Sequence, residues 1–184
     1  MRMKRGSSQL LIVDVQEKLL PAVVDPEALL AKITFLAKVA MRLDVPITIS
    51  EHYPRGLGPT AAAIREAVGN AAVTLGKVHF SCMDDEGLKT RFTALKAEGR
   101  NQIVVAGMEA HVCVTQTALS LVDSGFETYL VADAITSRTS SSCAIAADRL
   151  RQAGCVPVAT EMVMFEWLEK AGTAEFKDLL GLIR

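Results

Sequence analysis

The sequence predicts a single three-layer α/β/α domain over residues 1–184, with about six mainly parallel strands. Short β-branched apolar runs alternate with longer helical patterns, which is typical of βαβ units. The strand runs are almost continuously apolar, as expected where helices cover both faces of a parallel sheet. A chain of 184 residues is also long enough to bury the core of one such domain.

The first half of the chain supplies three of the expected strands. In order, we expect a buried strand at 10–15, a helix from Pro26 to about Leu43, a strand at 46–50, a short helix at 60–68 and a strand at 72–75. Asp25 is suited to cap the first helix, because an aspartate accepts from free helical N–H groups and a proline follows it. The Pro/Gly-rich segment 51–59 is expected to be a long loop, either a lid over a site or structural support.

The second half continues the alternation. In order, we expect a helix capped by Asp84 and running to about Glu98, a strand at 102–107, a helix from Val112 to Ser124, a strand at 127–133, a helix at 139–153, a short strand at 155–159 and a helical segment in one or two pieces at 161–184. No repeat or linker divides the chain. Ligands of such sheets bind beyond the carboxyl ends of the strands, so the turns there are the place to search for a site.

Composition argues against several functional classes. The net charge is −1 with no basic block, so neither a nucleic acid nor an anionic membrane surface is an expected partner. No apolar run approaches the ~18 residues that span a bilayer. The basic start resembles a signal peptide, but Asp14 interrupts the apolar run and no small-residue cleavage site follows, so we interpret it as a strand. A mean hydropathy of +0.27 favours a homo-oligomer, a dimer or larger.

Cysteine usage and glycine patterns bear on location and cofactors. The four cysteines form no CxxC pair and the chain has three histidines, which disfavours a zinc cluster or a disulfide framework and favours a reducing cytoplasm. The turns after the strands contain neither GxGxxG nor a Walker lysine, so no nucleotide cofactor is expected. A small molecule is the expected ligand.

Three residues with chemical potential follow predicted strands. Asp14 ends the first strand, Lys77 follows the third and Cys113 follows the fourth, so all three face the same edge of the sheet. Near the start of a helix, N–H groups and the helix dipole would depress the pKa of the Cys113 thiol. Position alone leaves other interpretations open, namely a capping aspartate, a solvated loop lysine and a small buried apolar cysteine.

A family resemblance joins these residues. The stretches LLIVDVQ, GKVHFSCM and VVAGMEAHVCVTQTAL resemble the isochorismatase-like cysteine hydrolases, which include nicotinamidases and N-carbamoylsarcosine amidohydrolases. The resemblance runs from about Ser8 to the C-terminal helix and is closest to the isochorismatase-domain-containing proteins. It implies a Rossmann-like hydrolase fold and a triad of Asp14, Lys77 and Cys113.

The resemblance also implies a mechanism. Cys113 would attack the carbonyl carbon of a small amide or carbamoyl compound, and water would hydrolyse the resulting thioester. Asp14 would carry the proton, while Lys77 would hold Asp14 and favour the thiolate. A cis peptide between Met108 and Glu109 is implied as well, with the backbone N–H groups of Glu109 and Cys113 forming the oxyanion hole.

The sequence differs from nicotinamidases at two places that bear on the metal and on the substrate. Nicotinamidases carry an Asp-x-His metal signature where this chain has Ser-Glu-His-Tyr at 50–53, and the adjacent Glu51 and His52 would tend to point apart, so no metal is expected. Nicotinamidases often have Thr-Asp before the cysteine, where this chain has Ala110 and His111, which disfavours nicotinamide as the substrate.

Other residues and other functions remain open. Tyr53, Phe80 and His111 are candidates to line a substrate pocket, although a loop support, a core aromatic and a loop histidine are the ordinary alternatives. The same triad would suit an esterase or thioesterase. A non-catalytic binding or scaffold protein is a further alternative. A redox-sensing thiol would need a resolving cysteine, and none lies near Cys113 in the sequence.

Overall fold

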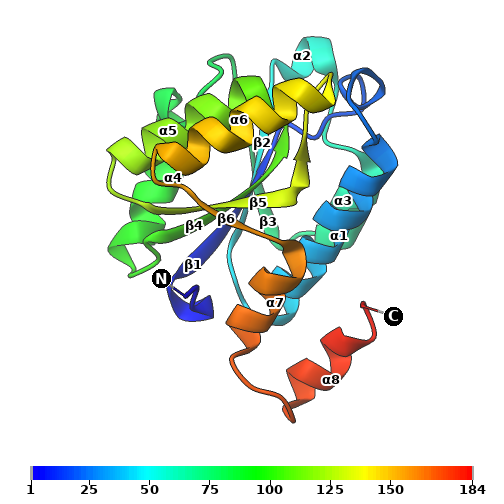
Figure 1. Ribbon diagram of the computed structural model, residues 1–184, viewed down its shortest axis with the longest axis vertical. Helices are drawn as coiled ribbons and strands as arrows, with labels where there is room; N and C mark the ends of the chain where they lie inside the picture. The colour runs from blue at the N-terminus through cyan, green and yellow to red at the C-terminus, as the bar shows by residue number, and fades with distance from the viewer. Residues whose placement is uncertain (1, 184) are drawn as a thin grey trace.

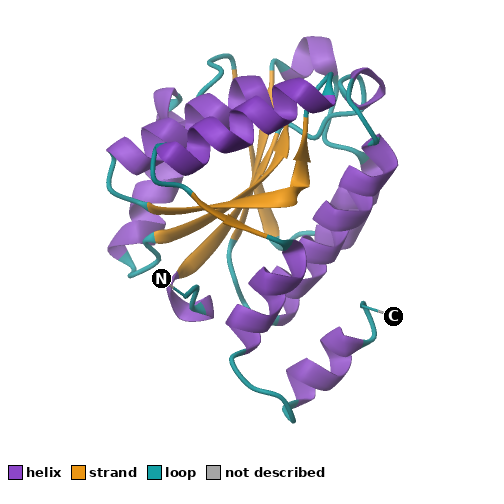
Figure 2. Cartoon of the chain, viewed as in Figure 1, coloured by secondary structure: helices purple, strands orange, loops and turns teal. Residues whose placement is uncertain are grey.

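Six parallel strands form the middle layer of the structure, a computed structural model that describes residues 2–183 (Figures 1 and 2). The sheet order is β3-β2-β1-β4-β5-β6. The strands are β1 (Ser8–Val13), β2 (Ile47–His52), β3 (Ala72–Lys77), β4 (Gln102–Met108), β5 (Glu127–Thr136) and β6 (Val156–Val158). The predicted fold class, a six-stranded parallel sheet in a three-layer α/β fold, is confirmed.

Helices cover both faces of the sheet (Figure 1). One layer holds α1 (Pro26–Arg42), α3 (Ala62–Val68), α7 (Thr160–Leu168) and α8 (Ala174–Leu180), and the other holds α4 (Glu86–Ala97), α5 (Thr115–Asp123) and α6 (Ser140–Gln152). Alternate side chains of β1 serve the two layers, because successive residues of a strand point to opposite faces. Leu10 and Ile12 join the α1 core, whereas Leu11 and Val13 join the α5 core.

Of the two predicted helix caps, one is confirmed and one is wrong. Asp25 caps α1 as predicted, accepting from the backbone N–H of Ala28. The prediction that Asp84 caps the next helix is wrong. Asp84 ends a short 3₁₀ turn, and the Asp85 carboxylate accepts from the first free N–H groups of α4.

The C-terminal region is helical in two pieces, α7 and α8, while Arg184 lies outside the described residues. Within residues 2–183, no helix combines the length and the apolar character needed to cross a membrane.

The segment predicted as a long loop is more ordered than expected. Strand β2 extends to His52, and a single helical turn, α2 (Pro54–Leu57), follows it. The Gln16 side chain donates to the carbonyls of His52 and Gly58, and it accepts from the His52 N–H. The Glu51 carboxylate accepts from both the N–H and the hydroxyl of Thr60. These bonds tie the segment to the sheet edge, which favours structural support over a mobile lid.

The chain reverses its direction of travel across the sheet between β1 and β4, which is the topological switch point where ligands of such sheets bind. Glycine is required at this point. Gly107 has φ +126°, and a Cβ on it would lie 2.2 Å from the carbonyl oxygen of Val13. The close approach of the two backbones places the turn after β4 beside the turn after β1.

Candidate active site

Asp14 directly follows β1 and lies fully buried at the switch point. Its φ of +51° is in the left-handed region, which aspartate tolerates better than most residues. One carboxylate oxygen lies 2.7 Å from the Lys77 Nζ, and the other accepts from the Ser50 hydroxyl at 2.6 Å. An isolated buried carboxylate would be costly, and these two partners offset that cost.

Lys77 is the last residue of β3, and its ammonium group is fully occupied within the protein. It donates to Asp14 at 2.7 Å and to the carbonyls of His79 and Phe80 at 3.1 and 3.2 Å. Burial alone would lower the pKa of Lys77, but the neighbouring Asp14 carboxylate outweighs burial and the pKa is raised. Through these three bonds, Lys77 links Asp14 to the carbonyl groups of residues 79 and 80.

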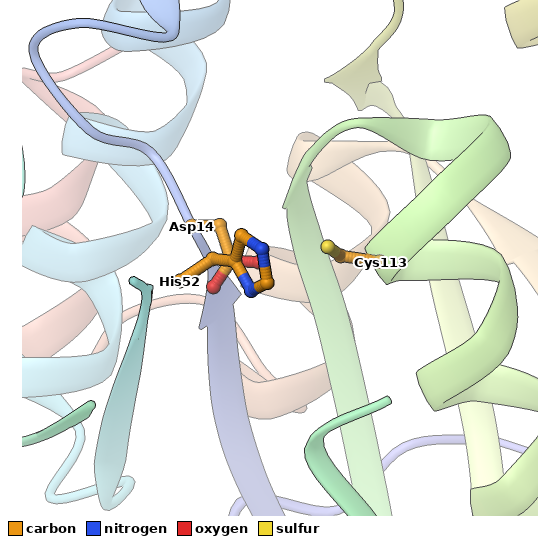
Figure 3. A group of neighbouring side chains, drawn as sticks. All are labelled: Asp14, His52 and Cys113. Atoms are coloured by element: carbon orange, nitrogen blue, oxygen red, sulfur yellow. The ribbon is translucent and has the colours of Figure 1, made fainter. Parts of the chain in front are cut away.

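Cys113 lies in a π-helical turn, Ala110–Val114, between β4 and α5. Its side chain is 6% exposed, and its sulfur points toward Asp14 and His52 (Figure 3). The prediction of a depressed thiol pKa is wrong. Burial first, and then the Asp14 charge and its hydrogen bond to the thiol, raise the pKa of Cys113 against the opposing effect of Lys77. The thiol is therefore protonated at neutral pH, with Asp14 in position to accept its proton.

Two residues of β2 belong to this group, although the sequence analysis did not select them. Ser50 bonds to Asp14, and the His52 ring stacks on Phe80 with centroids 5.3 Å apart. Burial and then the Lys77 charge lower the pKa of His52, so its ring is neutral at pH 7. The available signal was the i, i+2 spacing, which puts both polar side chains on one face of the strand at its carboxyl end.

Asp14, His52 and Cys113 form a group of three metal-ligand side chains (Figure 3). Each offers one ligand atom, and these atoms lie within 4.8 Å of one another. The His52 Nδ1 is buried without a hydrogen-bond partner. Glu51 and His52 do have different partners, as the sequence suggested, because Glu51 bonds to Thr60. His52 instead joins residues from two other strand ends, a grouping that the sequence analysis missed.

A second ion pair involves Glu109, which lies four residues before Cys113 in the chain. Glu109 is 8% exposed, and its carboxylate accepts from the Arg138 guanidinium through two bonds, of 2.6 and 3.1 Å. The Met108–Glu109 peptide bond is cis in the structure. The Glu109 carbonyl accepts from the N–H groups of Val112 and Val114, which ties down the turn that carries the cysteine.

The three predicted pocket residues have different surroundings. Phe80 is half-exposed and lies against His52, so it borders the group described above. The Tyr53 ring is also half-exposed and lies against Gly56 within its own turn. The exposed His111 ring is hydrogen-bonded to the hydroxyl of Ser137, at 3.0 Å. Phe80 therefore borders the candidate site, the Tyr53 backbone N–H donates to the Lys77 carbonyl, and a pocket role for Tyr53, Phe80 and His111 stays a prediction.

A second thiol lies in the same electrostatic environment. Cys82 is completely buried, and burial followed by the Asp14 charge raises its pKa to about 11. It is far from Cys113 in the sequence, yet in the fold it lies near enough to contribute to the raised pKa of Cys113. The two thiols differ in solvent exposure, because Cys113 is slightly exposed whereas Cys82 is completely buried.

A surface hollow of about 390 Å³ lies elsewhere, between α1, β5 and α6. None of Asp14, Lys77 and Cys113 lines it. The chemistry of the strand ends, rather than the size of a hollow, therefore locates the candidate site.

An acid, a lysine and a cysteine are grouped at the switch point of this parallel α/β/α sheet, which is where enzymes of this architecture bind their ligands. The chain belongs to the isochorismatase family, since the sequence model of the Isochorismatase domain matches residues 8–162. The family resemblance that was identified from the sequence is therefore confirmed.

The chain is similar to a relative and to solved structures along nearly its whole length. Isochorismatase domain-containing protein 2 of Danio rerio is 31% identical over 183 residues, covering 99% of this chain and 89% of that protein. The structure of MAR1 ribonuclease from Caenorhabditis elegans superposes with a TM-score of 0.92 at 26% identity, covering 100% of this chain and 92% of that one. The YcaC protein of Escherichia coli, described as an octameric hydrolase of unknown specificity, gives 0.89 at 24% identity and covers 99% and 90%.

Proposed function

We propose that the protein is a metal-independent cysteine hydrolase that cleaves a C–N bond of a small amide or carbamoyl compound. The observation that carries this proposal is the arrangement around Asp14. Its carboxylate is bonded to the Lys77 ammonium at 2.7 Å, and one of its oxygens lies within 4.8 Å of the Cys113 sulfur, near enough for Asp14 to raise the pKa of the thiol. A general base must lie within reach of the proton it removes, and this carboxylate is beside the thiol.

In the first half-reaction, Asp14 takes the thiol proton as the Cys113 sulfur attacks the substrate carbonyl carbon. The C–N bond then breaks, the protonated Asp14 gives its proton to the departing nitrogen, and a thioester remains on Cys113. A raised pKa of the Cys113 thiol is compatible with this order of steps, because the proton is transferred during the attack and not before it.

In the second half-reaction, water attacks the thioester. Asp14 accepts a proton from that water, the C–S bond breaks, and the proton returns to the sulfur as the acid leaves. The backbone N–H groups of Glu109 and Cys113 are the proposed oxyanion donors, on the basis of the family resemblance. Lys77 keeps the carboxylate oriented through both steps.

The ability of Asp14 to protonate a leaving group favours an amide over an ester as the substrate. An amine leaves poorly unless it is protonated, and Asp14 holds a proton once the sulfur has attacked. An ester or thioester would not need this proton, although the same residues would accept it. One structurally similar protein is named as a ribonuclease. A net charge of −1 offers little attraction for a phosphate backbone, which disfavours RNA as the substrate of this chain.

We also propose a homo-oligomer in a reducing cytoplasm. The exposed Met162 and Phe165 on α7 support association between copies, and the related YcaC protein is described as octameric. All four cysteines are free in the structure, which supports a reducing compartment.

A substrate panel combined with Cys113→Ala tests the function. Small amides, carbamoyl compounds and esters are incubated with the protein, and released ammonia, amine or alcohol is measured. We expect turnover of an amide or carbamoyl compound, abolished in Cys113→Ala without a change in the circular dichroism spectrum. Cys143→Ala is the matched control, since that half-exposed thiol lies outside the group, and it should keep the wild-type rate. Full activity in Cys113→Ala would refute the proposed nucleophile.

A further inference from the structure

We propose that Asp14, His52 and Cys113 form a reversible Zn²⁺ site that opposes the hydrolase activity. The site is not a cofactor site. It uses the catalytic sulfur as a ligand and adds His52, a residue for which the proposed hydrolysis has no role. Metal binding goes beyond the proposed function and can be measured without any substrate.

The three side chains come from separate strand ends that the sheet order brings together. His52 ends β2, Asp14 follows β1, and Cys113 follows β4, and these are three adjacent strands. Their ligand atoms lie within 4.8 Å of one another (Figure 3). Ligand atoms of a tetrahedral zinc site are about 3.3–3.6 Å apart, given the usual Zn–N and Zn–S bond lengths. Side-chain rotations that move these atoms by about 1 Å would therefore close the site around the ion.

The donor set is one that zinc prefers. Thiolate, imidazole and carboxylate are its common protein ligands, and three of them leave a fourth position for water. The His52 imidazole offers a ring nitrogen as a ligand, and Phe80 stacks against the ring. Its Nδ1 is buried without a hydrogen-bond partner, which is unusual for a polar atom of this kind. A metal ion bound at Nδ1 or at Nε2 would give this ring a function.

The surrounding charges make the site exchangeable rather than structural. The Lys77 ammonium lies 2.7 Å from Asp14 and repels a dication. Asp14 also divides its two oxygens between Lys77 and Ser50 before any ion arrives. Only the thiolate formed on binding adds a negative charge, so the affinity is expected to be well below that of a structural zinc site with several thiolates.

Binding blocks the nucleophile. As Zn²⁺ binds, the Cys113 thiol loses its proton to solvent and the sulfur lone pair forms the Zn–S bond. The sulfur is then unavailable to attack a carbonyl carbon, and Asp14 is unavailable as a base. Removal of the ion by a chelator returns the proton to the sulfur and restores the free thiol, with no change of oxidation state.

The test measures metal binding directly on the full-length, reduced protein. Zn²⁺ affinity is determined by competition with a chromophoric chelator for the wild type, Cys113→Ser and His52→Gln. We expect one ion per chain in the wild type and at least a ~10–100-fold loss of affinity in each variant, since even outer-shell changes at zinc sites cost this much. Co²⁺ should give a thiolate-to-metal charge-transfer band that is absent in Cys113→Ser.

The chain offers matched controls. His79→Gln and His111→Gln remove exposed histidines outside the group, and both should bind Zn²⁺ as the wild type does. Zn²⁺ should also slow alkylation of Cys113 in the wild type, and EDTA should reverse the effect. Circular dichroism and thermal melts of each variant confirm that it is folded.

Two outcomes would overturn the site. Unchanged affinity in His52→Gln, with loss in Cys113→Ser, would mean that the thiol binds zinc without the histidine. Loss of affinity in His79→Gln or His111→Gln would move the metal to the surface. Neither result depends on turnover, so a protein that hydrolyses no amide can still bind zinc here, and an active hydrolase can fail this test.

Discussion

Two carboxylates, Asp14 beside the Cys113 thiol and Glu109 four residues before it in the chain, are each paired with a cation, and the two ion pairs differ in burial. Asp14 and Lys77 are both fully buried, and their 2.7 Å contact is shielded from water. Glu109 is almost buried, but the side chain of its partner Arg138 is 64% exposed. Opposite charges attract more strongly where water is excluded, and they also cost more to leave unpaired.

This difference separates two roles around one sulfur. The Asp14 pair perturbs the thiol directly, because the Asp14 charge is the second-largest cause of the raised pKa of Cys113. Glu109 is not among the main causes of that shift, and its pair with Arg138 links the residue before the cysteine-bearing turn to the segment that precedes α6. We therefore expect substitutions at the first pair to change chemistry and stability strongly, and substitutions at the second to change both only slightly.

The largest effect is expected for Asp14→Asn. The amide keeps the shape of the side chain but cannot accept a proton from the thiol, and loss of a general base typically costs ~10²–10⁴-fold in rate. Measurement of kcat with the best substrate of the panel tests this expectation, with Glu109→Gln as the matched control. Equal losses in the two variants would show that Asp14 has no special role.

Lys77→Met comes next, with stability as the main measurement. The change leaves Asp14 charged and buried without its cation, and breaking a buried pair in this way typically costs ~3–5 kcal/mol in the free energy of unfolding. Urea denaturation measures this loss.

The double variant Asp14→Asn/Lys77→Met provides the control for that experiment. It removes both charges together and should recover much of the lost stability, since no unpaired charge remains. If the double variant is as unstable as Lys77→Met, the loss would reflect packing of the lysine side chain rather than an uncompensated charge.

The fold was predictable because its signals are local and repeated. Apolar β-branched runs alternating with helical patterns give a parallel sheet, and the structure has the predicted strands in the predicted order along the chain. Precise boundaries were less accessible. Asp84 and Asp85 are both suited to capping, but Asp84 is part of the 3₁₀ turn Cys82–Asp84, so Asp85 is the residue that caps α4.

The site was predictable only in part. Asp14, Lys77 and Cys113 could be selected from strand ends and family resemblance, and the first two do pair. His52 was missed because its neighbours are distant in sequence, and only the sheet order reveals them. The thiol pKa was predicted in the wrong direction, since the sequence shows the start of a helix but neither the depth of the sulfur nor its distance from Asp14.

A smaller effect, and a distinctive one, is expected for alkylation of Cys113. Only the thiolate reacts, so a raised thiol pKa means that the iodoacetamide rate should rise about tenfold per pH unit through neutral pH. Removing the Asp14 charge lowers that pKa, so Asp14→Asn should be alkylated faster than the wild type at pH 7 even though its turnover is slower. Glu109→Gln should match the wild type. Slower alkylation of Asp14→Asn would contradict the proposed effect of the carboxylate.

The smallest effect is expected for Arg138→Gln. The guanidinium is exposed, so water can solvate the Glu109 carboxylate once the arginine is gone, and surface ion pairs contribute little to stability. The melting temperature should change only slightly, and kcat should fall far less than in Asp14→Asn, through looser positioning of the turn that carries Cys113. Arg138→Lys restores the charge without the two-bond geometry and should lie between the variant and the wild type. A loss of kcat as large as that of Asp14→Asn would instead mean that Arg138 contacts the substrate, and that the two pairs do not divide their roles by burial.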